Sequence, residues 1–160
     1  MPKGLLRVAD GVCEIEIGFH PLTPRAESRL PERATEGAAG WDIRALLTKA
    51  LRIEPGERVL IPTGFALTIP RGYEAQLRPR SGWALRTGVT LLNSPGTIDS
   101  DYRGEIKILL INLGNEAVWV RDGDRIAQLV IGKVQPVTFV KKEAVIPTSR
   151  GEGGFGHTGR

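Results

Sequence analysis

Glycine recurs through the middle of this 160-residue chain at intervals of six to ten residues. Short strands separated by turns at that spacing are typical of an all-β sandwich or barrel. Several of these glycines stand in strong turn dipeptides, among them Pro55-Gly56, Pro95-Gly96 and Asp122-Gly123. The full series is Gly56, Gly64, Gly72, Gly82, Gly88, Gly96, Gly104, Gly114 and Gly123. The spacing therefore predicts a fold made mainly of antiparallel strands.

The segments between the glycines carry strand patterns. Residues 12–17 alternate apolar and acidic side chains, as expected for a strand with one covered face. Residues 108–111 are apolar on both faces, so a second sheet or another subunit is expected to cover the second face. Further strands are predicted over residues 58–63, 65–69, 73–77, 105–113 and 125–134.

One short helix is expected inside the domain. Ser81 has the residue type of an N-cap, and Gly88 is suited to end a helix of about two turns. Residues 20–40 are predicted to form a loop. Because five glycines follow Pro147, we expect a β domain over residues 1–147 and a mobile tail over residues 148–160.

Composition narrows the class of protein. The chain is 41% hydrophobic and 25% charged, which fits one globular domain rather than a disordered chain. Its net charge of +4 suits an anionic ligand such as phosphate, a nucleotide or nucleic acid. Cys13 is the single cysteine, which excludes an internal disulfide and a cysteine zinc cluster and favours a reduced, cytoplasmic compartment. No apolar run is long enough to span a membrane, and the N-terminus lacks a signal-peptide pattern.

The C-terminal segment contains a literal G-x-G-x-x-G at residues 151, 153 and 156. A dinucleotide-binding interpretation fails, because that motif must open a helix and only four residues follow Gly156. Successive glycines still allow a close approach of backbone N–H groups to phosphate, Arg150 can bind phosphate, and Phe155 can stack on a base. The alternative is a disordered tail without a ligand.

Two further segments carry groups that suit a nucleotide. Arg80 and Ser81 lie where a strand meets the expected helix, a place that favours phosphate; alternatively, Ser81 only caps the helix and Arg80 pairs with a buried acid.

Residues 93–105 predict a hairpin with its tip near residues 101–103, which would bring Ile98 and Ile106 together. Asp99 at its mouth has the chemistry of a general base, although Asp is also common in turns.

Two weaker motifs complete the set. Gln128 lies in an expected strand and either reaches a ligand or faces solvent. Asp42 points to the opposite side from Trp41 and Ile43, and it either serves a site or hydrogen-bonds a neighbouring loop.

Together and in this order, the five motifs resemble those of the trimeric dUTPase family. The matching segments are residues 39–42, 78–82, 93–105, 124–128 and 150–159, so the likeness covers nearly the whole chain. The resemblance implies a jelly-roll-like β subunit of the β-clip type and a homotrimer whose three active sites each draw on all three chains. It also implies Mg²⁺-dependent hydrolysis of dUTP to dUMP and pyrophosphate.

The resemblance also implies roles for individual residues. Asp99 matches the base that activates water for attack on the α-phosphorus, and Tyr102 matches the ring that packs on the deoxyribose. Asn93, Thr97, Ile98 and Lys107 match the groups that recognise uracil. The phosphates are assigned to Arg80, Ser81, Gly82, Gln128, Arg150, Gly156 and Thr158, and Phe155 is expected to stack on uracil. Asp42 orders either the water shell of the metal or the geometry of its motif, with no direct metal ligand from a side chain.

Two positions differ from the family pattern. His157 stands where the family usually has Ser, and Trp83 stands where Leu or a small residue is commoner, so Trp83 is expected near the pocket or a subunit interface.

Three alternatives stand beside the dUTPase assignment. One is a non-enzymatic regulatory descendant of the family, which should have lost Asp99 or the tail arginine, whereas this chain has kept both. A deoxycytidine triphosphate deaminase shares the subunit fold, but the tail motif and Tyr102 favour hydrolysis. A barrel that binds RNA or single-stranded DNA needs clustered exposed aromatic residues, and the nine aromatic residues do not cluster in this way. No nucleic-acid or membrane partner is therefore expected.

Overall fold

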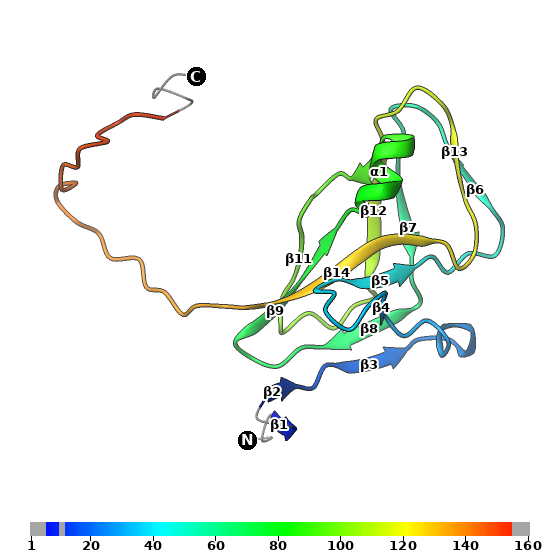
Figure 1. Cartoon of the computed structure of the whole chain (residues 1–160), viewed down its shortest axis with the longest axis horizontal. Helices are drawn as coiled ribbons and strands as arrows, with labels where there is room; N and C mark the ends of the chain where they lie inside the picture. Colours follow the sequence, from blue (N-terminus) through cyan, green and yellow to red (C-terminus); the bar gives the residue numbers. More distant parts are fainter. Residues whose placement is uncertain (1–5, 10–11, 155–160) are drawn as a thin grey trace.

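The computed structural model describes residues 6–9 and 12–154 and consists mostly of β-strands, which confirms the predicted all-β class (Figure 1). The largest sheet has five strands in the order β11-β9-β14-β5-β4, and a second sheet has the order β10-β12-β7. Three two-stranded sheets pair β3 with β8, β6 with β13 and β1 with β2. All pairs among the described strands are antiparallel, as a jelly-roll-like fold requires.

The strands follow one another along the whole described chain. Their bounds are β1 Leu6–Ala9, β2 Val12–Ile15, β3 Gly18–Pro21, β4 Glu32–Arg33, β5 Trp41–Arg44, β6 Leu51–Ile53, β7 Arg58–Pro62, β8 Phe65–Thr68, β9 Tyr73–Arg78, β10 Val89–Leu91, β11 Gly96–Ile98, β12 Lys107–Asn112, β13 Val118–Val120 and β14 Arg125–Lys133. The residues 20–40 that were expected to form a loop also contain the end of β3, β4 and a short 3₁₀ helix, Pro24–Ala26.

Helix α1, Ser81–Thr87, confirms the single predicted α-helix, with one correction at its start. Arg80 occupies the N-cap position in extended backbone conformation, and no side chain caps the helix there. Ser81 is therefore the first helical residue and not the N-cap. The predicted end is right: Gly88 adopts a φ of 74° and its N–H donates to the Ala84 carbonyl.

The core lies between the sheets and is built from alternating side chains. On β12, Ile108 and Leu110 are fully buried, whereas Leu109 and Ile111 on the other face are only half-buried. Leu60 of β7 pairs in register with Leu109 and is 56% exposed. The second apolar face of β12 therefore receives no covering sheet from the described part of its own chain.

The predicted hairpin around residues 93–105 is wrong in its pairing. Strand β11 pairs with β9, so that Ile98 lies opposite Ala75, and β12 pairs with β10 and β7. The two arms thus belong to different sheets. Similarly, the Asp122-Gly123 turn exists, but the strands that it joins, β13 and β14, lie in different sheets.

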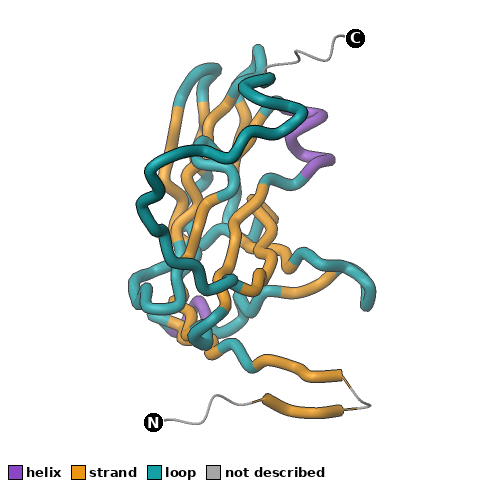
Figure 2. Tube along the Cα trace, turned by 90° about the vertical axis from the view of Figure 1, so that its left-hand side faces the viewer, coloured by secondary structure: helices purple, strands orange, loops and turns teal. Residues whose placement is uncertain are grey.

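Both ends of the described chain project from the body. The β1-β2 pair forms a separate ribbon, seen from the side in Figure 2. After β14 the chain extends away in irregular conformation, and every residue from 135 to 152 is exposed (Figure 1). Exposure thus begins well before residue 148, and the domain boundary at residue 147 stays a prediction. No helix in the described part of the chain is long and apolar enough to cross a membrane.

Asp122, in the turn before β14, contacts two segments that are distant in the sequence, one with Arg25 and Arg29 and one with Leu47. Its carboxylate accepts a hydrogen bond from the Leu47 N–H at 2.9 Å and pairs with Arg29 at 2.9 Å and Arg25 at 3.2 Å. Burial raises the pKa of Asp122, but the Leu47 hydrogen bond and the charges of Arg29 and Arg25 outweigh it. The pKa therefore lies below its ordinary value of 3.8.

Asp122→Asn is expected to lower the free energy of unfolding at pH 7. Because the folded-state pKa is depressed, this stabilisation is complete above the unfolded-state pKa and is lost as the pH falls through the folded-state pKa. The difference in stability between wild type and variant should thus shrink below about pH 4. Urea denaturation from pH 7 to pH 3 measures it, with Glu143→Gln in the exposed C-terminal segment as the control. A difference that stays constant over this range would contradict the prediction.

Candidate active site

A cavity of about 550 Å³ opens between the N-terminal end of α1, the start of β5 and the middle of β14. Its walls combine small residues with charged and polar side chains. The lining residues are Ala34, Ala38, Ala39, Gly40, Asp42, Arg80, Ser81, Gly82, Trp83, Arg86, Arg125 and Gln128. Three guanidinium groups against one carboxylate give this cavity a positive charge, which suits an anionic ligand.

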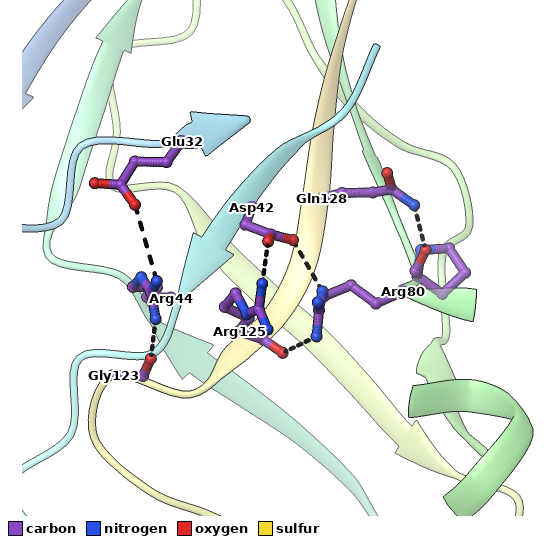
Figure 3. Close-up of polar contacts among 8 residues, drawn as sticks. Glu32, Asp42, Arg44, Arg80, Gly123, Arg125 and Gln128 are labelled. Carbon is purple, nitrogen blue, oxygen red and sulfur yellow. Dashed lines mark hydrogen bonds and ion pairs between the residues drawn. The ribbon is translucent and has the colours of Figure 1, made fainter. Parts of the chain in front are cut away.

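Asp42 holds two of the arginines in place, as Figure 3 shows. One carboxylate oxygen accepts from Nε of Arg80 at 2.9 Å, and the other accepts from Nη1 of Arg125 at 3.0 Å. The Asp42 side chain is only 14% exposed. Arg80 also donates to the Arg125 carbonyl at 3.4 Å. The Asp42 carboxylate thus fixes both guanidinium groups at the cavity wall, and Arg80 is at once an ion-pair partner and a lining residue.

Gln128 reaches the same cavity from β14. Its Nε2 donates to the Pro79 carbonyl at 2.9 Å, which links β14 to the segment before α1 (Figure 3). A Cβ atom at position 40 would collide with Oε1 of Gln128, so the glycine there leaves space for this side chain. Gln128 thus lies at the cavity, one of the two alternatives that the sequence left open.

A second cavity, of about 380 Å³, lies beside the segment between β11 and β12. Its lining residues are Leu60, Thr97, Ile98, Asp99, Tyr102, Glu105 and Lys107. The Tyr102 N–H donates to the Asp99 carbonyl at 3.1 Å, and the Tyr102 hydroxyl donates to the Glu105 carbonyl at 3.1 Å. These two bonds fix the tyrosine ring next to the exposed Asp99 carboxylate.

Glu105 organises the other side of the second cavity. Its Oε1 accepts from the Gly64 N–H at 2.8 Å, and its Oε2 pairs with Nζ of Lys107 at 3.5 Å. The ion pair therefore holds Lys107 at the wall of the second cavity, even though β11 and β12 do not pair with each other.

Among the residues that the structure describes, the two cavities share no lining residue. The structure brings together Arg80, Ser81, Gly82, Gln128 and Asp42 in the first, and Asp99, Thr97, Ile98, Tyr102 and Lys107 in the second. Asn93 lines neither and is exposed, with Nδ2 next to Gly96.

The C-terminal residues of the predicted site are not brought to either cavity in the described chain. Arg150 is exposed in the extended segment, where Nε donates to the Gly153 carbonyl at 2.9 Å. Phe155, Gly156, His157 and Thr158 lie outside the described residues.

Some lining residues were not predicted from sequence. Trp83 lies at the first cavity, as one of its two expected places, but Arg125 and Arg86 were not named as site residues. Arg125 stands inside the fourth motif, three residues before Gln128, and Arg86 follows Gly82 by one helical turn. In the second cavity, Glu105 is the last residue of the third motif, whereas Leu60 gave no comparable local signal, because only strand pairing brings it there.

Comparison with known proteins decides the family. The model of the dUTPase family matches residues 26–159. The chain belongs to the dUTPase family. A deoxyuridine 5'-triphosphate nucleotidohydrolase of Desulfotalea psychrophila is 58% identical over 130 residues, covering 81% of this chain and 87% of that protein. One of Chlamydia muridarum is 52% identical over 148 residues, covering 92% and 96%.

Solved dUTPases share the fold as well. The structure of a Staphylococcus bacteriophage 80alpha dUTPase G164S mutant with dUpNHpp superposes with a TM-score of 0.78 at 28% identity, covering 91% of this chain and 99% of that one. As a member of the dUTPase family, the chain is an enzyme of the dUTP diphosphatase type.

Proposed function

We propose that the chain hydrolyses dUTP to dUMP and pyrophosphate, which limits uracil incorporation into DNA and supplies dUMP for dTMP synthesis. The dUTPase family match supports this reaction. The observation that carries the proposal is the chemistry of the two cavities, one cationic and suited to phosphates, the other with a carboxylate beside a fixed aromatic ring.

The active enzyme is proposed to be a homotrimer with active sites shared between subunits. Uracil, sugar and phosphates form one covalent molecule, so the two cavities must face each other in the working enzyme. Since they share no lining residue in the described part of one chain, association of chains is the simplest way to join them. The half-exposed apolar face with Leu60, Leu109 and Ile111 offers a surface for that association.

Asp99 is proposed as the general base. Its carboxylate takes a proton from water while the water oxygen forms a bond to the α-phosphorus. The bond from that phosphorus to the bridging oxygen breaks in line, and its electron pair leaves with pyrophosphate. Such a base contributes roughly 10²- to 10⁴-fold to the rate. Asp99 is also proposed to accept a hydrogen bond from the deoxyribose 3′-hydroxyl.

The second cavity is proposed to bind the deoxyribose and the uracil base. The Tyr102 ring, fixed through its hydroxyl at 3.1 Å from the Glu105 carbonyl, packs on the deoxyribose and leaves no room for a 2′-hydroxyl. Uracil is assigned to Thr97, Ile98 and Lys107, together with Asn93. A thymine methyl group would clash there, and cytosine presents the wrong donor pattern.

The first cavity is proposed to hold the phosphates. Arg80, Ser81 and Gly82 line it together with Gln128, whose side chain donates to the neighbouring Pro79 carbonyl. The C-terminal segment is proposed to close over the nucleotide. In that state Phe155 stacks on uracil, and Arg150, Gly156 and Thr158 bind phosphate oxygens.

The donor set fits an Mg²⁺ ion that is bound mainly through the nucleotide. Mg²⁺ keeps several waters and takes one or two carboxylates plus phosphate oxygens. Among the described residues no three acidic, His or Cys side chains gather as a metal site. Both oxygens of Asp42 accept from arginines, which supports its role in ordering the motif. When bound, the ion neutralises phosphate charge.

The enzyme is proposed to work in the cytoplasm. Its single Cys13 suits a reducing compartment. The anionic partner is proposed to be the nucleotide, with no nucleic-acid or membrane partner.

Pyrophosphate release from dUTP, dCTP, dTTP and UTP, measured with Mg²⁺ and with EDTA, tests the function. We expect release from dUTP alone and its loss in EDTA. Ammonia release from dCTP would support the deaminase instead. Release that is equal for dUTP and UTP would contradict the role of Tyr102.

A further inference from the structure

Arg86 lines the cationic cavity from the last turn of α1. It follows Gly82 by four residues, so both lie on one helix face. Helical side chains lean toward the N-terminus, which carries the guanidinium back over the first turn. Its Nη1 would lie 3.3 Å from a Cβ atom on Gly82. The Arg86 charge therefore stands directly beside the segment assigned to the phosphates.

The ion pairs of the cavity distinguish Arg86 from the other two arginines. The single lining carboxylate, Asp42, binds Arg80 at 2.9 Å and Arg125 at 3.0 Å. Arg86 takes part in no ion pair with any residue that the structure describes, and its side chain is exposed at the cavity. Two of the three positive charges thus share one carboxylate, while the charge of Arg86 remains available to a ligand.

We propose that Arg86 is a further substrate-binding residue, which binds the polyphosphate of the nucleoside triphosphate. The inference rests on the proposed function and adds to it. A planar guanidinium donates two parallel hydrogen bonds to phosphate oxygens. Because Thr97, Ile98, Tyr102 and Lys107, which are assigned to base and sugar, line the other cavity, Arg86 acts on the phosphates. It therefore favours the triphosphate over the monophosphate product.

The test compares full-length wild type, Arg86→Gln, Arg86→Lys and Arg121→Gln. Arg121 is an exposed arginine that does not line this cavity, so its variant controls for the loss of one positive charge. Calorimetry with Mg²⁺ measures the dissociation constants of dUpNHpp and dUMP. We expect Arg86→Gln to weaken dUpNHpp binding by at least about tenfold, the effect of a lost hydrogen bond between charged groups. Binding of dUMP should change less than about threefold, since one phosphate makes fewer contacts with the cavity.

The variants separate a binding role from a structural one. Arg86→Lys should recover part of the dUpNHpp affinity, and Arg121→Gln should match wild type. Equal losses for dUpNHpp and dUMP would indicate a disturbed fold and overturn the inference.

Turnover of dUTP by wild type separates the inference from the proposed function. If wild type hydrolyses dUTP and Arg86→Gln binds dUpNHpp normally, only the role of Arg86 fails. If wild type does not hydrolyse dUTP, the proposed function fails, whereas dUpNHpp binding that depends on Arg86 would still support this inference.

Discussion

Asp99→Asn is expected to lower kcat for dUTP by roughly 10²- to 10⁴-fold, the contribution of a general base. The amide has nearly the shape of the carboxylate but cannot accept the proton of the attacking water. Because the Asp99 side chain is exposed and its backbone carbonyl makes the bond to Tyr102, the fold and the second cavity should persist. Single-turnover kinetics and dUpNHpp calorimetry measure the two effects separately.

Asp101→Asn provides the matched control for this variant. Asp101 is an exposed acid two residues away and does not line the second cavity. Its substitution removes the same charge and should leave kcat close to wild type. If both variants lose the same activity, the effect comes from charge near the cavity and Asp99 is not the base. A dUpNHpp affinity that falls as steeply as kcat would also argue against proton transfer.

Ending the chain after Pro147 is expected to lower kcat/KM by roughly 10³- to 10⁵-fold, the effect of an arginine supplied by a closing segment in other phosphoryl-transfer enzymes. The deletion removes Arg150 and the residues assigned to the nucleotide. The strands and the core end with β14 at Lys133, so the melting temperature should stay within about 2 °C of wild type. Activity assays and thermal unfolding test both parts.

Point variants locate the effect within the C-terminal segment. Arg150→Gln in the full-length chain should reproduce part of the loss, whereas Lys141→Gln, in the same exposed segment, should not. Normal turnover by the truncated chain would end the assignment of this segment as a lid. A fall in melting temperature of several degrees would show that it also stabilises the β domain.

Local sequence patterns predicted the elements of the fold well. Alternation of apolar side chains and turn glycines indicate strands and their ends because the pleat has a period of two and φ > 0 favours Gly. The strands at β7, β8, β9, β12 and β14 therefore lie close to the predicted ranges. Gly88 ends the helix for the same reason. The N-cap position of Arg80 was missed because α1 begins without a side-chain capping bond: backbone N–H groups of Trp83 and Ala84 donate to the Arg80 carbonyl.

The choice of strand partners depended on contacts far apart in the chain. Nothing local in residues 93–105 shows that β11 pairs with β9 while β12 pairs with β10 and β7. The same long-range pairing brings Leu60 to Asp99 and places Asp42 beside Arg80 and Arg125.

For the candidate site too, the sequence determined one part and the tertiary structure another. The sequence by itself determined which residue types carry the chemistry, since motif order and spacing are properties of the chain. Only the tertiary structure decided that these residues line two cavities with no described lining residue in common. It also decided that Asp42 forms ion pairs with Arg80 and Arg125 and not with Arg86, whose charge is therefore available to the ligand. The physical reason is that ion pairing and burial depend on distances in space, which sequence separation does not fix.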